Sequence, residues 1–488
     1  MSVRDRARRA LERLIAASAA ERVAISLASL VLSLVIGTLI ILAGGRMTTC
    51  EEAAFVLTHP QPFGVPQLFR MGFCYDPVNV FDRLFLGALG DPLKDGWGPL
   101  SPFSGGPLNP FREGYDPLNR QMSDTLRETT ILVFTGLSVA LAFRAGIFNI
   151  GSQGQMIVGG LATAMAVLWA SSLFSGLVGT LVLIPLGLFV GAVFGGLYGA
   201  VPGALKAYAD ANEVITTIML NFVATGVILY LVRDVFKDPD SLSNQTEPLP
   251  DFATFPSFLF PDYYGFSFVA LAFAALCILA LYYVLTRTAF GYDLRTSGIQ
   301  PEAAEYGGVD AKRTIVASMS LSGALAGVGG AVYVLMVLGN YQTGVPAYGF
   351  DGITVAILAG NNPLGVGFAA FLFGVLKSGT TVVQFSTNVP PQLVGVLRGL
   401  IILFVAMPEF FRMAGRRVLP ADERPGEPVA ATDGGHTHGD SGVSENGVES
   451  DAPTHGDGVE SDDARTHGDS VASDDAHESA DSTGGERR

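Results

Sequence analysis

The chain has 488 residues, of which 49% are hydrophobic and only 15% are charged, and its mean hydropathy is +0.40. This composition excludes an ordinary soluble enzyme and is typical of a membrane protein with many spans. The formal net charge of -15 comes from the end of the chain, because residues 418–488 hold 18 Asp and Glu against 4 Lys and Arg.

The chain begins with an arginine-rich segment. Residues 1–22 contain six arginines and precede an uninterrupted apolar run at residues 23–44. That run is close to the roughly 20 residues that a bilayer core requires, so it predicts a first transmembrane helix and not a cleaved signal peptide. The positive-inside rule then places residues 1–22 in the cytoplasm.

A long segment rich in Pro, Gly and Asp follows the first span. Counting from a cytoplasmic N-terminus, residues 45–128 form an extracellular loop. This loop holds Cys50 and Cys74. An oxidising exterior permits a disulfide between them, and two free thiols are the alternative.

Apolar segments separated by short polar connections make up residues 129–411, which we predict to be the transmembrane core. With the first helix they predict an all-α membrane helix bundle of about 9–10 transmembrane segments with discontinuous helices. Residues 352–360 either cross as part of a bent helix or form a re-entrant hairpin, which would remove one crossing. The expected segments are residues 129–151, 156–174, 177–205, 214–232, 267–285, 315–337, 352–360, 364–383 and 392–410.

Glycines recur at helical spacing in two of these spans. Gly191, Gly195 and Gly199 lie four residues apart, as do Gly323 and Gly327. This spacing lets helix backbones approach closely in lipid, so it predicts tight helix packing and no ligand site.

Two of the apolar segments are interrupted by polar residues. RAGIFNIGSQG at residues 144–154 makes the first break, and residues 361–363 make the second. Non-helical backbone in a membrane must be buried in protein or line a watery cavity, so paired breaks indicate a solute path. Neutral side chains along it suit a polar, uncharged solute; the alternative is that they cap broken helix ends. They are Phe148, Asn149, Gln153, Gln155, Asn221, Asn340, Gln342, Asn361 and Asn362.

Two basic residues, Lys377 and Arg398, interrupt the later apolar segments. A charge at membrane depth needs a partner. No carboxylate in the apolar segments is an obvious partner, so we expect the two side chains to extend to the membrane surface or to contact backbone carbonyls. This expectation weakens the case for ion-coupled transport.

A cytoplasmic connection at residues 286–313 is predicted between two spans. Pro301 and the acids after it favour a short helix, which Gly307 and Gly308 end. An exposed short helix between two spans is suited to act as a lever for a partner protein.

The tail at residues 412–488 is acidic and has few large apolar residues. It cannot bury enough apolar area to offset the entropy of ordering, so we predict disorder. Its histidines are single and widely spaced, and we predict no metal site there.

Four blocks in chain order resemble a known family. They are GLSVALAFRAGIFNIGSQGQMIVGG, ANEVITTIMLNFVATG, GIQPEAAEYGG and FDGITVAILAGNNPLGVGFAAFLFGVL. They are similar to permease subunits of ABC importers for simple sugars and nucleosides, the branch related to branched-chain amino acid permeases. The first and last blocks resemble the nucleoside type most.

The resemblance implies a set of partners and a site on this chain. The partners are a second permease copy or paralogue, cytoplasmic ATPase subunits that bind ATP and Mg, and an extracellular solute-binding protein. The lipid bilayer surrounds the core, and no nucleic acid is expected. The loop that docks the ATPase would contain Glu302, Ala303, Ala304, Glu305 and Gly307.

The sequence also shows what this chain lacks. It has no GxxxxGK[ST] phosphate loop, so ATP hydrolysis is expected on another subunit and no cofactor on this chain. We therefore predict a non-enzymatic permease that takes up a polar neutral solute, a nucleoside or a simple sugar, by alternating access. The alternatives are an ion-coupled secondary transporter and a membrane receptor or scaffold; the latter does not explain paired polar breaks.

Overall fold

The computed structural model describes residues 19–58, 70–92 and 115–406. Every described residue belongs to one compact unit.

Three predictions from the sequence fall outside the described residues. They concern the cytoplasmic segment 1–22, of which only the last four residues are described, the end of the last span after residue 406, and the acidic tail at 412–488.

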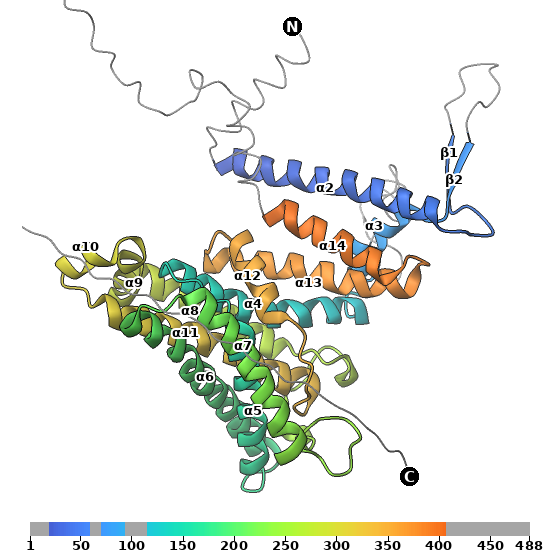
Figure 1. The fold of residues 1–488 in the computed structure, drawn as a ribbon. Helices are drawn as coiled ribbons and strands as arrows, with labels where there is room; N and C mark the ends of the chain where they lie inside the picture. Colours follow the sequence, from blue (N-terminus) through green and yellow to red (C-terminus); the bar gives the residue numbers. More distant parts are fainter. Residues whose placement is uncertain (1–18, 59–69, 93–114, 407–488) are drawn as a thin grey trace, which may run out of the picture. The chain divides into compact units, whose positions relative to one another are not determined.

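Helices make up about three quarters of the described chain (Figure 1). Among these residues, eight helices are long and apolar enough to cross a membrane, and α12 and α14 are apolar but shorter. This confirms the predicted all-α bundle of about 9–10 segments with discontinuous helices. The long helices are α2 (Ala19–Met47), α4 (Arg120–Arg144), α5 (Ser152–Ala170), α6 (Gly176–Ala209), α7 (Glu213–Tyr230), α8 (Phe268–Arg287), α11 (Ala311–Val332) and α13 (Pro363–Ser386), and the shorter pair is α12 (Tyr348–Leu358) and α14 (Pro391–Ala406).

Small elements connect the long helices. Between α2 and α4 lie an antiparallel hairpin, in which Phe55 pairs with Phe73, and a short helix. Between α8 and α11 lie two further short helices, and the ends of α7 and α11 continue as π-helical turns. These elements are β1 (Phe55–Thr58), β2 (Arg70–Phe73), α3 (Pro77–Phe85), η1 (Gly87–Leu89), η3 (Leu231–Val235), η4 (Asp251–Ala253), η5 (Asp262–Tyr264), α9 (Ala289–Ile299), α10 (Pro301–Tyr306) and η6 (Tyr333–Leu338).

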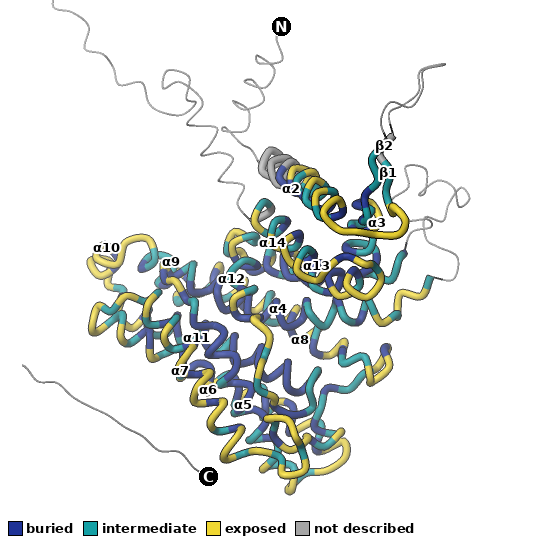
Figure 2. The backbone as a smooth tube through the Cα atoms, turned by 45° about the vertical axis from the view of Figure 1, so that its right-hand side comes forward, coloured by how far each residue is buried: buried dark blue, intermediate teal, exposed yellow. Residues whose placement is uncertain are grey.

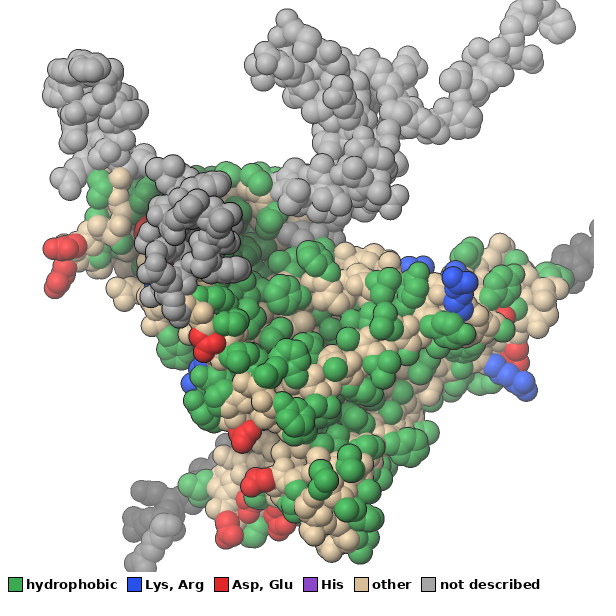
Figure 3. Space-filling model, turned by 180° about the vertical axis from the view of Figure 1, so that it is seen from behind, with side chains coloured by type: hydrophobic (Ala, Val, Ile, Leu, Met, Phe, Trp, Pro, Cys, Tyr) green, Lys and Arg blue, Asp and Glu red, His purple; other side chains and the backbone are tan. Residues whose placement is uncertain are grey.

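Helix α4 is the central helix of the bundle. Of the 18-residue apolar stretch in this helix, 83% is buried inside the protein, against 22% of the corresponding stretches in α7 and α8. It packs against α8, α11, α12 and α13, and Figure 2 shows buried backbone concentrated around α4 and α11. The outer helices keep large apolar side chains such as Phe189, Phe222 and Leu276 exposed, as expected where lipid surrounds the protein. Figure 3 shows one face on which hydrophobic side chains are abundant and charged side chains are few.

The glycine stripes of α6 and α11 face each other. A Cβ atom on Gly195 would lie 2.5 Å from the Gly323 carbonyl oxygen and 2.7 Å from the Gly327 Cα. No side chain fits in that space, so the predicted close packing of the two stripes is confirmed.

The start of α4 corrects the predicted boundary between loop and core. The helix begins at Arg120 and not at residue 129, and the Asn119 side chain caps it by accepting a hydrogen bond from the Met122 amide at 2.8 Å. Several charged residues in the first turns lowered the hydropathy there, so the sequence pattern resembled a loop. Residues 120–128 therefore belong to the helical core.

A disulfide joins the end of α2 to the segment before α3. The Sγ atoms of Cys50 and Cys74 are 2.02 Å apart. Of the two alternatives that the sequence left open, the structure therefore has the bonded pair, which fixes the start of the connection between α2 and α4.

Candidate functional site

The first polar break separates α4 from α5 at residues 145–151. Gly146 adopts a positive φ of 69°, and its backbone contacts Gly298 of α9 so closely that a Cβ atom would lie 2.5 Å from the Gly298 carbonyl oxygen. The chain therefore turns at Gly146, where it also meets α9.

Asn149 organises this break from a fully buried position. Its Oδ1 accepts a hydrogen bond from the Gly151 amide at 2.9 Å, and its Nδ2 donates to Gln155 Oε1 at 2.9 Å and to Ser322 Oγ at 2.7 Å. Ser138 of α4 connects to the same group, because its Oγ lies 3.1 Å from the Oγ of Ser322. Such a network is favourable at this depth only because its polar groups have partners.

Asn221 supports the same break from α7. Its Oδ1 accepts a hydrogen bond from the Gly154 amide at 2.8 Å, and its Nδ2 donates to the Ile150 carbonyl at 2.9 Å. Both are backbone groups that the interrupted helix leaves without a helical partner. Asn221 therefore replaces the missing helical hydrogen bonds.

Gln153 joins the first break to the start of α12. Its Nε2 donates to the Pro346 carbonyl at 3.1 Å, and its Oε1 accepts from the Gly349 amide at 2.8 Å. A Cβ atom on Gly349 would overlap the backbone of Gln153. The two regions are about 200 residues apart in the sequence and meet here. We call Asn149, Gln153, Gln155 and Asn221, with the backbone groups that they bind, the amide junction.

The second break is the tight turn between α12 and α13. Gly360 and Asn361 have φ values of 59° and 57°, and Asn362 caps α13 by accepting a hydrogen bond from the Leu364 amide at 3.2 Å. Arg144, the last residue of α4, donates from Nε to the Asn361 carbonyl at 2.8 Å. The end of α4 is thus tied to this turn.

Five of the nine residues predicted along the path lie apart from the amide junction: Asn361 and Asn362 in the second break, and Phe148, Asn340 and Gln342. The Phe148 side chain is 53% exposed and packs against the Phe143 ring. Asn340 and Gln342 lie in the connection between α11 and α12, where Gln342 pairs with Gln245. Burial raises the pKa of the neighbouring Tyr341 hydroxyl above its ordinary value, so it stays neutral. The structure therefore brings together the amides of the first break and Asn221.

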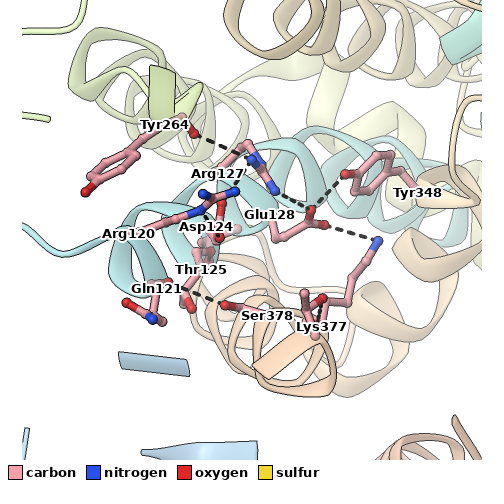
Figure 4. Close-up of polar contacts among 12 residues, drawn as sticks. Arg120, Gln121, Asp124, Thr125, Arg127, Glu128, Tyr264, Tyr348, Lys377 and Ser378 are labelled. Carbon is pink, nitrogen blue, oxygen red and sulfur yellow. Dashed lines mark hydrogen bonds and ion pairs between the residues drawn. The ribbon is translucent and has the colours of Figure 1, made fainter. Parts of the chain in front are cut away.

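A charged network that the sequence did not predict lies where α4, α12 and α13 meet (Figure 4). Lys377 Nζ lies 3.2 Å from Glu128 Oε2 and 3.0 Å from Asp351 Oδ2. The same ammonium group is 3.8 Å from the centre of the Tyr348 ring, and the Tyr348 hydroxyl donates to Glu128 Oε1 at 3.0 Å. The expectation that Lys377 has no carboxylate partner is wrong, because the predicted boundaries place Glu128 in a loop and Asp351 just before a short helix.

The network borders a cavity of about 640 Å³ between the start of α4, the end of α13 and α14. We call this space the charged cavity. Its lining contains hydroxyl and amide side chains, together with the charged residues Arg120, Asp124, Arg127, Glu128, Lys377 and Arg398.

The short helix α10 presents the predicted docking residues. Glu302, Ala303, Glu305 and Gly307 are exposed, whereas Ala304 is buried. Tyr306 is 96% exposed and Ile299, at the end of α9, 87%. Two large apolar side chains and two acids are therefore exposed on α10 and at the end of α9.

Comparisons with known proteins agree on one family. A family model described as "Branched-chain amino acid transport system / permease component" matches residues 121–406. The nucleoside ABC transporter permease protein NupB of Lactococcus lactis is 32% identical over 351 residues, which cover 70% of this chain and 86% of that protein. The guanosine permease NupP of Bacillus subtilis is 36% identical, with coverages of 58% and 80%.

A sugar permease is also similar. The glucose ABC transporter permease protein TsgB13 of Haloferax volcanii is 31% identical, over 60% of this chain and 77% of that protein. The family match covers more than half of this chain, including α4 to α14. The chain therefore belongs to the branched-chain amino acid transport permease family, as a multi-pass membrane subunit of an ABC importer whose ATP hydrolysis resides in a separate subunit.

Proposed function

We propose that this permease imports a neutral nucleoside, with a simple sugar as the alternative substrate. The observation that carries the proposal is the amide junction, where the first break meets α7 and the start of α12 through buried, uncharged groups. Neutral amides offer donors and acceptors without fixed charge, which suits a polar neutral solute. The names of the similar permeases, for nucleosides, guanosine and glucose, support the same substrate classes.

The charge distribution supports an orientation with both termini in the cytoplasm. The connection at residues 286–313, which holds α9 and α10, carries four Lys and Arg, whereas the connection at residues 236–266 carries one. The positive-inside rule therefore favours a position of α9 and α10 on the cytoplasmic side of the cell membrane. With α12 counted as a crossing, ten segments return the chain to the side on which it began.

This orientation assigns a partner to each face. ATPase subunits with ATP and Mg would contact α9 and α10, including Glu302 and Glu305. A solute-binding protein would deliver the solute on the opposite face, and a second permease, identical or paralogous, would complete the path.

The contacts suggest how movement of the ATPases reaches the path. Gly298 of α9 touches Gly146 in the first break, and Arg144 beside it holds the Asn361 carbonyl of the second break. Displacement of α9 would move both breaks together and would strain the hydrogen bonds of Gln153. The free energy of ATP binding would then favour one of two arrangements of the junction.

Uptake by the complete transporter tests the proposal. The permease, its ATPase and its binding protein are reconstituted in proteoliposomes, and uptake of labelled inosine, guanosine and glucose is measured with and without ATP. We expect ATP-dependent nucleoside uptake that an ionophore does not abolish. ATP-dependent uptake of glucose alone would select the sugar alternative, and uptake that requires only an ion gradient would contradict the proposal.

Copurification tests the docking surface separately. Charge reversal at Glu302 and Glu305 is expected to release the ATPase. The matched control is reversal of Asp238 and Asp240 in the connection at residues 236–266, which should leave the ATPase bound.

A further inference from the structure

The charged cavity offers open volume that the amide junction lacks. In the junction the hydrogen bonds of Asn149, Gln153 and Asn221 close within the protein. The cavity measures about 640 Å³, within the range of roughly 300–1,000 Å³ that is common for small-molecule sites. A solute therefore finds room here before the junction opens.

The cavity is connected to the junction through α12. The Tyr348 hydroxyl binds Glu128 in the cavity wall, and the next residue, Gly349, donates its amide to Gln153. Lys377, also in the wall, binds Asp351 one turn further along α12. A solute that touches Glu128 or Lys377 is therefore connected to Gln153 of the junction through the first turn of α12.

Most of the charges in the wall have partners. Asp124 lies 3.8 Å from Arg120 and 3.0 Å from Arg127, and Glu128 pairs with Lys377. Arg398 of α14 differs, because no carboxylate of the described chain lies within 4.0 Å of its guanidinium group. Arg398 lies within an apolar helix and lines the cavity. Its guanidinium group can therefore donate hydrogen bonds to a solute.

The combination of donors and carboxylates fits the edge of a 6-oxopurine base. A guanidinium group donates two parallel hydrogen bonds to the O6 and N7 acceptors of a 6-oxopurine. A carboxylate accepts from the N1–H donor beside O6. Adenine presents an amino donor in place of O6, so it would leave an arginine donor opposed by another donor, and a hexose lacks this edge.

We propose that the charged cavity is the outward-facing solute site and that Arg398, with Glu128, selects 6-oxopurine nucleosides over adenosine. The inference rests on the proposed nucleoside import and adds the part of the molecule that recognises the base. Arg398 contacts the O6 and N7 edge, and Glu128 contacts the N1–H group while its ion pair with Lys377 holds it in place.

Direct binding separates this inference from the proposed function. The full-length permease with its ATPase, without the binding protein, is placed in lipid nanodiscs, and equilibrium binding of labelled inosine and adenosine is measured. Because the binding protein is absent, any preference belongs to the permease. We expect the wild type to prefer inosine by at least about tenfold, as one good bidentate contact contributes roughly 1–3 kcal/mol of discrimination.

Two variants and a matched control complete the test. Arg398→Gln should lose most of the preference, and Arg398→Lys should also lose it although the charge is kept, because an ammonium group does not match both acceptors. Arg233→Gln, which alters an exposed arginine outside the cavity, should bind as the wild type. If Arg398→Gln fails to assemble with the ATPase, Arg398→Lys decides the result.

The other outcomes count against the inference. An unchanged preference in Arg398→Lys would overturn it, as would an equal loss of both nucleosides, which would indicate a structural role or a bound lipid headgroup. No binding or no preference in the wild type would also overturn it. Nucleoside uptake by the complete transporter is scored separately, so the proposed function can survive any of these results.

Discussion

The amide junction and the charged cavity both involve the central helix α4, but their side chains differ in charge and in exposure. The side chains of the junction are neutral and at most 8% exposed, and their hydrogen bonds close within the protein. The cavity is lined by charges and holds open volume. Neutral pairs exchange partners at modest cost, about 1 kcal/mol each, which suits a gate. Charged groups separate at much higher cost, which suits a fixed wall that recognises a solute.

The largest effect is expected in the wall of the cavity. Lys377→Met leaves Glu128 and Asp351 as neighbouring carboxylates without their common cation. Loss of one partner of a largely buried pair costs about 3–5 kcal/mol, and we expect the lower end because the Lys377 side chain is 15% exposed. The heat-induced aggregation temperature of the detergent-solubilised complex measures this loss.

Neutralising the two acids should restore stability. In the triple variant Lys377→Met, Glu128→Gln, Asp351→Asn, most of the lost thermal stability should return. Arg233→Met, which removes an exposed ion pair with Asp234, should change stability by less than about 1 kcal/mol. Equal effects of Lys377→Met and Arg233→Met would mean that the wall is no more constrained than the surface.

A smaller effect is expected from breaking the junction. Gln153→Leu leaves the Gly349 amide and the Pro346 carbonyl without their partner, and an unsatisfied buried group costs about 1–3 kcal/mol. If the junction is the gate, uptake of inosine and adenosine should fall by the same factor, at least about tenfold. Exposed Gln342→Leu is the control. A change in the ratio of the two solutes would place recognition in the junction and remove the distinction between the two regions.

The smallest effect is expected at the second break. Asn362 is exposed and caps α13 through one hydrogen bond to the Leu364 amide. Asn362→Ala should cost about 1 kcal/mol of stability, the usual value of an N-cap, with uptake close to wild type. A large loss of uptake with normal stability would show that this amide belongs to the path and is not only a cap.

Much of this arrangement could be predicted from the sequence, because its causes are local. The glycine stripes of α6 and α11 follow from residue spacing, and the two breaks follow from polar residues such as Asn149 and Asn361 in apolar runs. The sequence left open whether the amides cap helix ends or line a path. The structure shows that Asn221 and Asn362 satisfy backbone groups in this conformation.

The charged network could not be predicted, because its causes are not local. Glu128 and Lys377 are 249 positions apart, so the local sequence around either residue does not predict the 3.2 Å ion pair. The charges in the first turns of α4 also lower the local hydropathy, so the sequence pattern predicts a loop where the core helix begins. A polar helix start beside a long loop, opposite an unexplained intramembrane lysine, is the signal that could have suggested the pair.

Thiol labelling of the junction tests the central claim most directly. Ser152 is fully buried beside Gln153, and Ser152→Cys with Cys277→Ala places a single free thiol there, apart from the Cys50–Cys74 disulfide. A water-soluble thiol reagent should modify it slowly in the resting transporter and at least about tenfold faster during ATP-driven uptake, because opening the junction admits water. The same slow rate in both states, while uptake continues, would show that the solute passes elsewhere and would contradict the account.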